Sequence, residues 1–297
     1  MKLNNLSLKD KEIFNKYLVL DEHDLSVYAF ANIYIWKGLF DIRWKIIEDS
    51  LCVFFSDRAG TFLYLEPLAK KMKPEVVGEV FKILDKFNTN IEISRIENAE
   101  EGNLDAYLRF GLEVKEKSCD YLCLRDSLAG LKGNELKSKR ASYNYFIKHY
   151  KFEYTKYLGQ DKDDCLKLYN LWAKQRKDSI KEDYYRFMLE DSLKSLSILL
   201  DNYDDLDCMG RLVRIDGKLK AFSFGFKLNK SSFCILYEIT DLSMKGLAQF
   251  IFREFCRELP DYKYINIMDD SGLENLKQVK LSYHPVKLEP AYIVKRK

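Results

Sequence analysis

Two strand-like runs on either side of Asp216-Gly217 constrain the fold of this chain more than any other feature. The runs, MGRLVRI and KLKAFSFGFKL, are rich in β-branched and aromatic residues, and Asp-Gly is a preferred pair for a tight hairpin turn. A third apolar run, Phe233 to Ile239, follows them. A helix-period run comes next, at Leu247, Phe250, Ile251, Phe255 and Leu259. This order predicts a hairpin, a buried strand and a helix that crosses back over the sheet.

The predicted helix begins with small residues, in the stretch Lys245-Gly246-Leu247-Ala248. A strand that leads into a helix with little bulk in its first turn leaves backbone N–H groups open to an anion. An ordinary strand–helix crossover with a chance glycine gives the same pattern, because short glycine motifs have many false positives. Both interpretations stay open at this point.

Composition describes a globular protein that is long enough for two domains. The chain has 297 residues, of which 47% are hydrophobic and 32% are charged. The net charge of +3 is too small to indicate nucleic acid or an anionic membrane, so a local cluster must carry any such partner. The N-terminal stretch MKLNNLSLKD has no signal-peptide core, and no window approaches the ~18 apolar residues of a membrane span. A cytoplasmic protein without a transmembrane segment is therefore predicted.

The seven cysteines have no framework spacing. Several lie inside apolar runs, which is typical of small buried side chains in a reducing compartment. Cys119 and Cys123 share a face of a predicted strand, but no second pair and no nearby histidine completes a zinc site. No metal is predicted.

The same order of elements occurs in both halves of the sequence. In the second half a helix capped by Asp163 and Asp164 and a helix from Glu182 to Leu193 precede the hairpin. The remaining predictions for the second half are a strand at Tyr264–Met268, a short helix through Leu276 and Val279, and a strand at Ala291–Val294. The predictions for the first half are a helix at Ser7–Leu20, strands at Trp44–Ile47, Leu51–Phe55 and Thr61–Leu65, a helix from Pro74, a strand at Ile91–Ile96, a helix at Leu104–Phe110 and a strand at Cys119–Leu124. We interpret this as an internal duplication, with one α/β domain at 1–150, including a basic linker helix, and a second at 151–297.

This order of elements resembles the GCN5-related N-acetyltransferase fold. The resemblance implies two tandem domains of that kind, each a mixed, mostly antiparallel sheet flanked by helices. It also places coenzyme A pyrophosphate at Lys245, Gly246 and Ala248, although Ser243 stands where the family has Gln or Arg. The matching region of the first half, LEPLAKKMKPEVV, has no glycine.

A closer resemblance, over nearly the whole chain, is to the C-terminal domain of phosphatidylglycerol lysyltransferase and its relatives of unknown function. The stretches FANIYIW, KGNELKSKRASYNYF and NIMDDSGLENLKQVKLSYHP carry it. The resemblance implies transfer of an aminoacyl group from aminoacyl-tRNA. The transmembrane portion of the membrane enzyme is not found in this sequence.

The expected reaction is attack of an acceptor amine or hydroxyl on an ester carbonyl, which needs a proton acceptor and positive charge near the oxyanion. Each candidate residue has a second interpretation. Glu238 is a candidate base or a solvated strand end. Asp269 and Asp270 are candidates to bind an aminoacyl ammonium or to cap the following helix. Lys280 is a candidate to stabilise an oxyanion or is a solvated lysine at a helix end.

The basic linker is the candidate anion-binding segment. Its cations alternate with aromatic residues, so it is either a tRNA-binding segment or a solvated amphipathic helix between domains. The predicted tRNA- or substrate-binding residues are Lys139, Arg140, Tyr143, Asn144, Tyr237 and Tyr283.

The sequence thus predicts an acyl or aminoacyl transferase that uses aminoacyl-tRNA and acts on a lipid headgroup, an envelope component or a small amine or hydroxyl acceptor. One alternative is an N-acyltransferase that uses acetyl- or acyl-coenzyme A. The other alternative is an inert binding protein that keeps the fold. The oligomeric state is left open.

Overall fold

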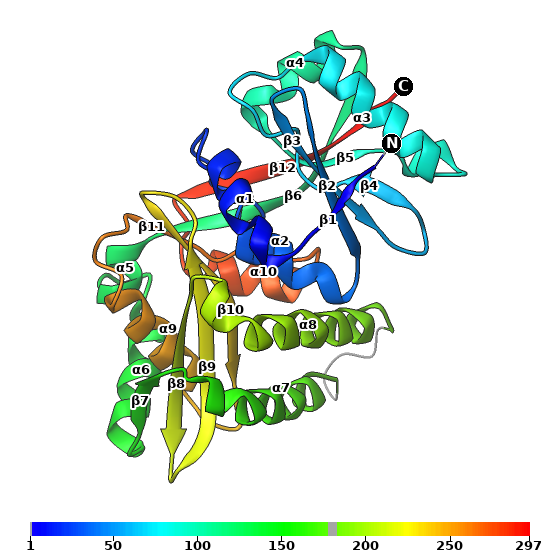
Figure 1. Cartoon of the computed structure of the whole chain (residues 1–297). Helices are drawn as coiled ribbons and strands as arrows, with labels where there is room; N and C mark the ends of the chain where they lie inside the picture. The colour runs from blue at the N-terminus through cyan, green and yellow to red at the C-terminus, as the bar shows by residue number, and fades with distance from the viewer. Residues whose placement is uncertain (1, 178–182) are drawn as a thin grey trace. The chain divides into compact units, whose positions relative to one another are not determined.

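The computed structural model describes residues 2–177 and 183–297, and the predicted helix start at Glu182 lies outside them. The chain forms two compact units (Figure 1). The first unit contains the chain up to Asp120 together with Asp269–Gly272 and Leu288–Lys297. The second contains Tyr121–Met268 and Leu273–Lys287. The basic linker, which is predicted to belong to the first domain, lies in the second unit.

The first unit is built on strands in the order β1-β2-β3-β4-β5-β12-β6. Strands β2, β3 and β4 form the predicted antiparallel meander, and β5 pairs in parallel with β4 through Leu63 and Ile96. The C-terminal strand pairs antiparallel with β5. The strand bounds are β1 Asn4–Asn5, β2 Asp41–Ile47, β3 Ser50–Ser56, β4 Thr61–Leu63, β5 Ile96–Glu100, β6 Leu112–Leu124 and β12 Lys287–Arg296.

Helix α3 (Pro74–Phe87) supplies much of the first unit's core. Proline occupies its first turn, where its missing N–H costs nothing, and its apolar stripe includes the fully buried Val80 and Leu84. This stripe packs with strand residues such as Phe54 and Ile96. The other helices of this unit are α1 Lys11–Leu18, α2 Phe30–Ile35 and α4 Leu104–Arg109, with 3₁₀ turns at Leu8–Asp10, Trp36–Gly38, Ile91–Ile93 and Glu101–Asn103.

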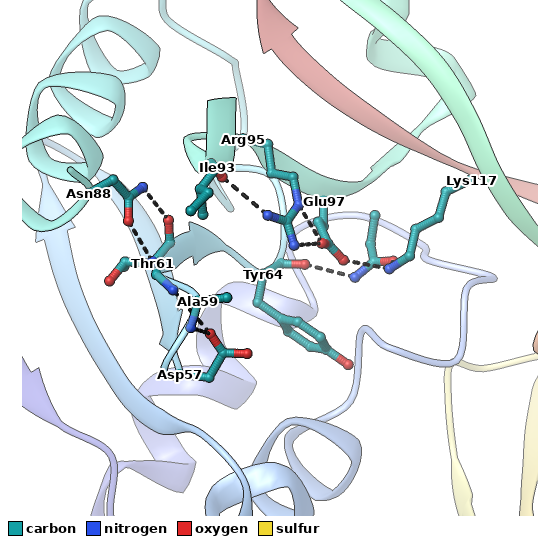
Figure 2. Close-up of polar contacts among 11 residues, drawn as sticks. Asp57, Ala59, Thr61, Tyr64, Asn88, Ile93, Arg95, Glu97 and Lys117 are labelled. Carbon is teal, nitrogen blue, oxygen red and sulfur yellow. Dashed lines mark hydrogen bonds and ion pairs between the residues drawn. The ribbon is translucent and has the colours of Figure 1, made fainter. Parts of the chain in front are cut away.

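The strand predicted at Ile91–Ile96 is wrong. Ile91–Ile93 is a 3₁₀ turn, Ile91 is 61% exposed, and β5 begins at Ile96. The observed strand is polar but buried, because Arg95 Nε donates to Glu97 at 2.7 Å and Lys117 Nζ binds Glu97 at 2.5 Å (Figure 2). Pairing of this kind makes burial of a carboxylate tolerable, and an alternating apolar pattern does not reveal it.

The second unit has the strand order β6-β11-β10-β9-β8-β7. The predicted hairpin is confirmed, with Asp216 (φ 49°) and Gly217 (φ 72°) in the left-handed conformation that its tight turn requires. The strand predicted at Phe233 to Ile239 is β10, which pairs antiparallel with β9 and in parallel with β11. The strand bounds are β7 Glu153–Lys156, β8 Cys208–Ile215, β9 Lys218–Lys227, β10 Ser232–Thr240 and β11 Tyr264–Asn266.

Helices cover both faces of this second sheet. Helices α7 and α8 lie on one face, and α5, α6 and α9 lie on the other (Figure 1). Phe250 of α9 is central to the second face, with its ring centroid 4.8 Å from that of Phe146 on α6. The helix bounds are α5 Arg125–Gly130, α6 Lys137–His149, α7 Lys162–Lys177, α8 Asp183–Asp201, α9 Leu247–Arg257 and α10 Glu274–Leu281, with 3₁₀ turns at Gly159–Asp161 and Tyr203–Asp205.

The order of elements repeats as predicted. The series β2, β3, β4, α3, β5, α4, β6 in the first half matches β8, β9, β10, α9, β11, α10, β12 in the second. In each series one helix connects the parallel pair, β4 with β5 and β10 with β11. The expected fold class, mixed and mostly antiparallel sheets flanked by helices, is confirmed.

Candidate functional site

Glu238 on β10 is the centre of a charged cluster inside the second unit. Burial raises the pKa of its carboxyl group, the charges of Lys139 and Lys280 oppose that rise, and the pKa lies at about 8. The two lysines come from α6 and α10, so three separate elements bring these groups together. A carboxyl group with a pKa near 8 exchanges its proton close to neutral pH, as a general base must.

Glu238 lies beyond the paired part of two parallel strands. The register between β10 and β11 ends at Cys234 and Asn266, whereas β10 continues to Thr240. An irregularity between Ile235 and Tyr237 also shifts the pairing of β10 with β9. Such bulges redirect side chains, and they are common beside active sites.

Lys139 joins this cluster from the first turn of α6. Its Nζ lies 4.0 Å from the ring centroid of Tyr283, which is 8% exposed. Burial lowers the pKa of Lys139, and the charge of Glu238 partly opposes that change. Burial also raises the pKa of Tyr283, and the charge of Glu238 adds to the rise. Lys139 therefore faces Glu238 as a cation that gives up its proton more easily than a solvated lysine.

Lys280 is 9% exposed, so its interpretation as a solvated lysine is wrong. Its Nζ donates to the backbone carbonyl oxygens of Ile267 and Met268, the second at 3.2 Å. These carbonyls follow β11 directly. The side chain thus fixes the end of β11 and also contributes positive charge to Glu238.

Gly246, at the start of α9, packs against α6. It has a φ of +84°, and a Cβ atom at this position would lie 2.1 Å from the backbone oxygen of Ser142. The Nζ of Lys245 lies 4.7 Å from the ring centroid of Tyr145, also on α6. Ala248 is half-buried. Close helix packing and a left-handed backbone therefore account for the glycine.

Asp269 and Asp270 belong to the first unit, whereas the cluster around Glu238 belongs to the second. They do not cap α10, which begins at Glu274 after Leu273, so the capping interpretation is wrong. Asp270 instead accepts from the N–H of Gly272 at 2.9 Å within the preceding turn.

Several residues of the predicted tRNA- and substrate-binding set make contacts inside the second unit. Arg140 donates to the carbonyl oxygens of Leu131 and Gly133. The buried Tyr143 donates its hydroxyl to Glu254 at 2.9 Å. The remaining two are Asn144, which is exposed, and Tyr237, whose hydroxyl lies 2.7 Å from Ser195 Oγ.

Sequence reasoning missed Glu66, the counterpart of Glu238 in the first unit. Each glutamate precedes a Met-Lys pair by six residues, at Met72-Lys73 and at Met244-Lys245. Burial raises the pKa of Glu66 to about 8 as well. Its partners are uncharged: Asn103 Nδ2 donates at 2.8 Å and Tyr107 Oη donates at 3.3 Å. An alignment of the two halves at their Met-Lys pairs identifies the equivalence.

Metal-binding and membrane-spanning features are not found in the part of the chain that the structure describes. Within residues 2–177 and 183–297, no three His, Cys, Asp or Glu side chains are arranged to hold a metal ion. No helix in these ranges combines the length and the apolar character that crossing a bilayer requires.

Comparison with known families identifies the chain's relatives. Residues 20–295 match the family described as "Phosphatidylglycerol lysyltransferase, C-terminal". The chain belongs to this family. No curated protein sequence matches it.

Solved structures of similar fold extend over almost the whole chain. A conserved protein of unknown function from Bacteroides thetaiotaomicron is 26% identical, with a TM-score of 0.88 and complete coverage of both chains. L-PGS from Bacillus licheniformis is 15% identical, with a TM-score of 0.66 over 97% of this chain and 92% of its own. FemX is 10% identical, with a TM-score of 0.63 over 100% of this chain and 98% of its own. The fold of the lysyltransferase C-terminal family is thereby confirmed.

Proposed function

We propose that this member of the lysyltransferase C-terminal family transfers an aminoacyl group from aminoacyl-tRNA to a hydroxyl or amine acceptor. The observation that carries the proposal is the buried carboxyl group of Glu238, whose pKa of about 8 is set by burial and by the opposing charges of Lys139 and Lys280. The family description names lysyl transfer to phosphatidylglycerol, so a lipid headgroup is the first acceptor to test.

In the proposed reaction Glu238 is the general base. Its carboxylate accepts the proton of the acceptor hydroxyl or amine while the acceptor attacks the ester carbonyl carbon. The ammonium group of Lys139 stabilises the negative charge that develops on the carbonyl oxygen. The C–O bond to the tRNA ribose then breaks, and Glu238 returns the proton to the ribose oxygen. Protons and charge balance without a covalent enzyme intermediate.

Lys280 has a positioning role in this proposal. Its bonds to the carbonyls of Ile267 and Met268 hold the end of β11 while its charge lowers the pKa of Glu238. Tyr283 orients Lys139 through the contact of its ring with the ammonium group.

The packing at Gly246 favours aminoacyl-tRNA over acyl-coenzyme A as the donor. In the coenzyme A alternative, Lys245, Gly246 and Ala248 bind the pyrophosphate at the start of α9. The carbonyl oxygen of Ser142 on α6 lies 2.1 Å from the place of a Cβ atom on residue 246, so α6 occupies the space beside this turn.

The test is transfer from radiolabelled aminoacyl-tRNAs to phosphatidylglycerol vesicles and to small amines. We expect Glu238→Gln to lower kcat/KM by about 10²–10⁴-fold, the usual contribution of a general base. The wild-type kcat/KM should rise with pH and level off above about 8, because the base must be ionised. Glu153→Gln, which changes an exposed carboxylate of the same unit, should behave as wild type.

Two results would overturn the proposal. An unchanged rate and pH profile in Glu238→Gln would remove this residue from the chemistry. Acetyl transfer from acetyl-coenzyme A without aminoacyl transfer would favour the N-acyltransferase alternative.

A further inference from the structure

The outward face of α6 carries lysines that the proposed chemistry does not use. A helix advances 100° per residue, so Lys137, Ala141, Asn144 and Lys148 fall within one narrow stripe, and all four are exposed. The inward side of the same helix holds Tyr143 and Phe146, which are buried. The stripe is therefore the face that α6 leaves uncovered within its own unit.

The charge of this face is uniformly positive. No acidic residue occurs between Lys137 and Lys151. Neither Lys137 nor Lys148 has an ion-pair partner among the residues that the structure describes. Lys245, held over the Tyr145 ring, adds a third cation on the flank of the helix.

We propose that this lysine stripe, Lys137, Ala141, Asn144 and Lys148 with Lys245 beside it, binds the phosphate backbone of the donor tRNA. The inference rests on the proposed function. The stripe is about 16 Å long, from the rise of a helix over eleven residues. That length spans several phosphates of a nucleic acid strand. Small side chains between the lysines let a nucleic acid backbone approach the helix.

The structure thus assigns two roles to one helix. Lys139, on the inward side of its first turn, faces Glu238, and Lys137 and Lys148 face outward. Because both sets lie on the same rigid element, binding tRNA on the outside fixes its position relative to Glu238 on the inside.

The experiment measures binding of deacylated tRNA to Lys137→Gln/Lys148→Gln as a function of salt. Losing two phosphate contacts should weaken binding at 0.1 M salt by at least about tenfold and reduce the slope of log K against log salt by about 1.4–1.8. The control is Lys218→Gln/Lys230→Gln, which removes two exposed lysines of the same unit and should leave both quantities unchanged.

The outcomes separate this surface from the proposed chemistry. Normal tRNA binding by the stripe variant, with aminoacyl transfer intact in the wild type, would overturn the stripe alone. If the stripe variant lost binding to phosphatidylglycerol vesicles but kept tRNA binding, the stripe would be a membrane contact. That result would also overturn the inference. A wild-type protein that neither binds tRNA nor transfers from it would overturn both proposals. Glu238→Gln should bind tRNA normally, because it changes only the inner face.

Discussion

The two equivalent glutamates, Glu66 and Glu238, differ in the charged groups that surround their carboxyl groups. Glu238 has two cations near it, whereas Glu66 is surrounded by Asn103, Tyr107 and the tyrosine at position 28, with Glu100 adding repulsion. A carboxyl group without a cation is most stable when it is protonated. We infer that the first unit keeps this carboxyl as a neutral hydrogen-bonding group, and that only the second unit uses it in the proposed chemistry.

This difference predicts the pH dependence of stability. The folded pKa of Glu66 is about 8 and the unfolded value is about 4.3, so between these values the folded state holds the extra proton. The contribution of Glu66 to the free energy of unfolding is therefore fully present below about pH 4.3 and is lost as the pH rises towards 8. Between these pH values, the free energy of unfolding falls by at most about 1.4 kcal/mol per pH unit because of this group.

Urea unfolding of Glu66→Gln at pH 5, 6.5 and 8 checks this expectation. The variant should lose less stability than the wild type as the pH rises. Glu113→Gln, an exposed carboxylate of the same unit, should follow the wild type. Parallel curves for wild type and Glu66→Gln would contradict the assignment.

At the scale of elements, the contact between α6 and α9 depends on one glycine. In Gly246→Ala, the backbone is strained by its φ of +84°. The new Cβ atom also lies 2.1 Å from the carbonyl oxygen of Ser142. We expect strain to cost about 1–2 kcal/mol and the overlap to cost roughly 1–3 kcal/mol more. Chemical denaturation measures the total.

Gly217→Ala is the matched control for this prediction. Gly217 has a φ of +72°, but a Cβ atom there would have no neighbour within 4 Å. Backbone strain alone should therefore destabilise the alanine variant. Equal losses of unfolding free energy in the two variants would show that the backbone at Ser142 moves to accommodate the Cβ atom. The packing of α6 would then not depend on the glycine.

Sequence patterns predicted the elements whose apolar faces are regular, and failed where polar groups are buried in pairs. The Asp216-Gly217 hairpin and α9 follow from turn chemistry and a 3.6-residue period. The strand at Ile96–Glu100 does not, because the burial of Glu97 depends on its bonds to Arg95 and to Lys117, and Lys117 is 20 residues away in the sequence.

The candidate site was predicted less completely than the fold. Glu238 stands out because it lies near the end of an apolar strand, but nothing in the sequence brings Lys139 near it. The charges of Lys139 and Glu238 influence each other because α6 packs with α9 inside the second unit, a long-range arrangement without a local signal. The helical period of α6 does distinguish its inward residues, such as Tyr143, from its outward lysines.

At the scale of the whole molecule, neither compact unit is a continuous piece of sequence. The first needs Leu288–Lys297 and the second needs Tyr121–Gly130. Separate fragments 1–150 and 151–297 should therefore each lack a strand of their own sheet. We expect both to be unfolded by circular dichroism when expressed alone. Two independently folded fragments would support a domain boundary near residue 150.

The late position of β12 also sets the order in which the protein can form during its synthesis. The last strand of the first unit leaves the ribosome after the whole second unit has been made. At about 5–20 residues per second, the N-terminal segment waits roughly ten to forty seconds for the strand that pairs with β5. During that interval the edge of β5 is open, so we expect the nascent chain to benefit from a chaperone that shields unpaired strands.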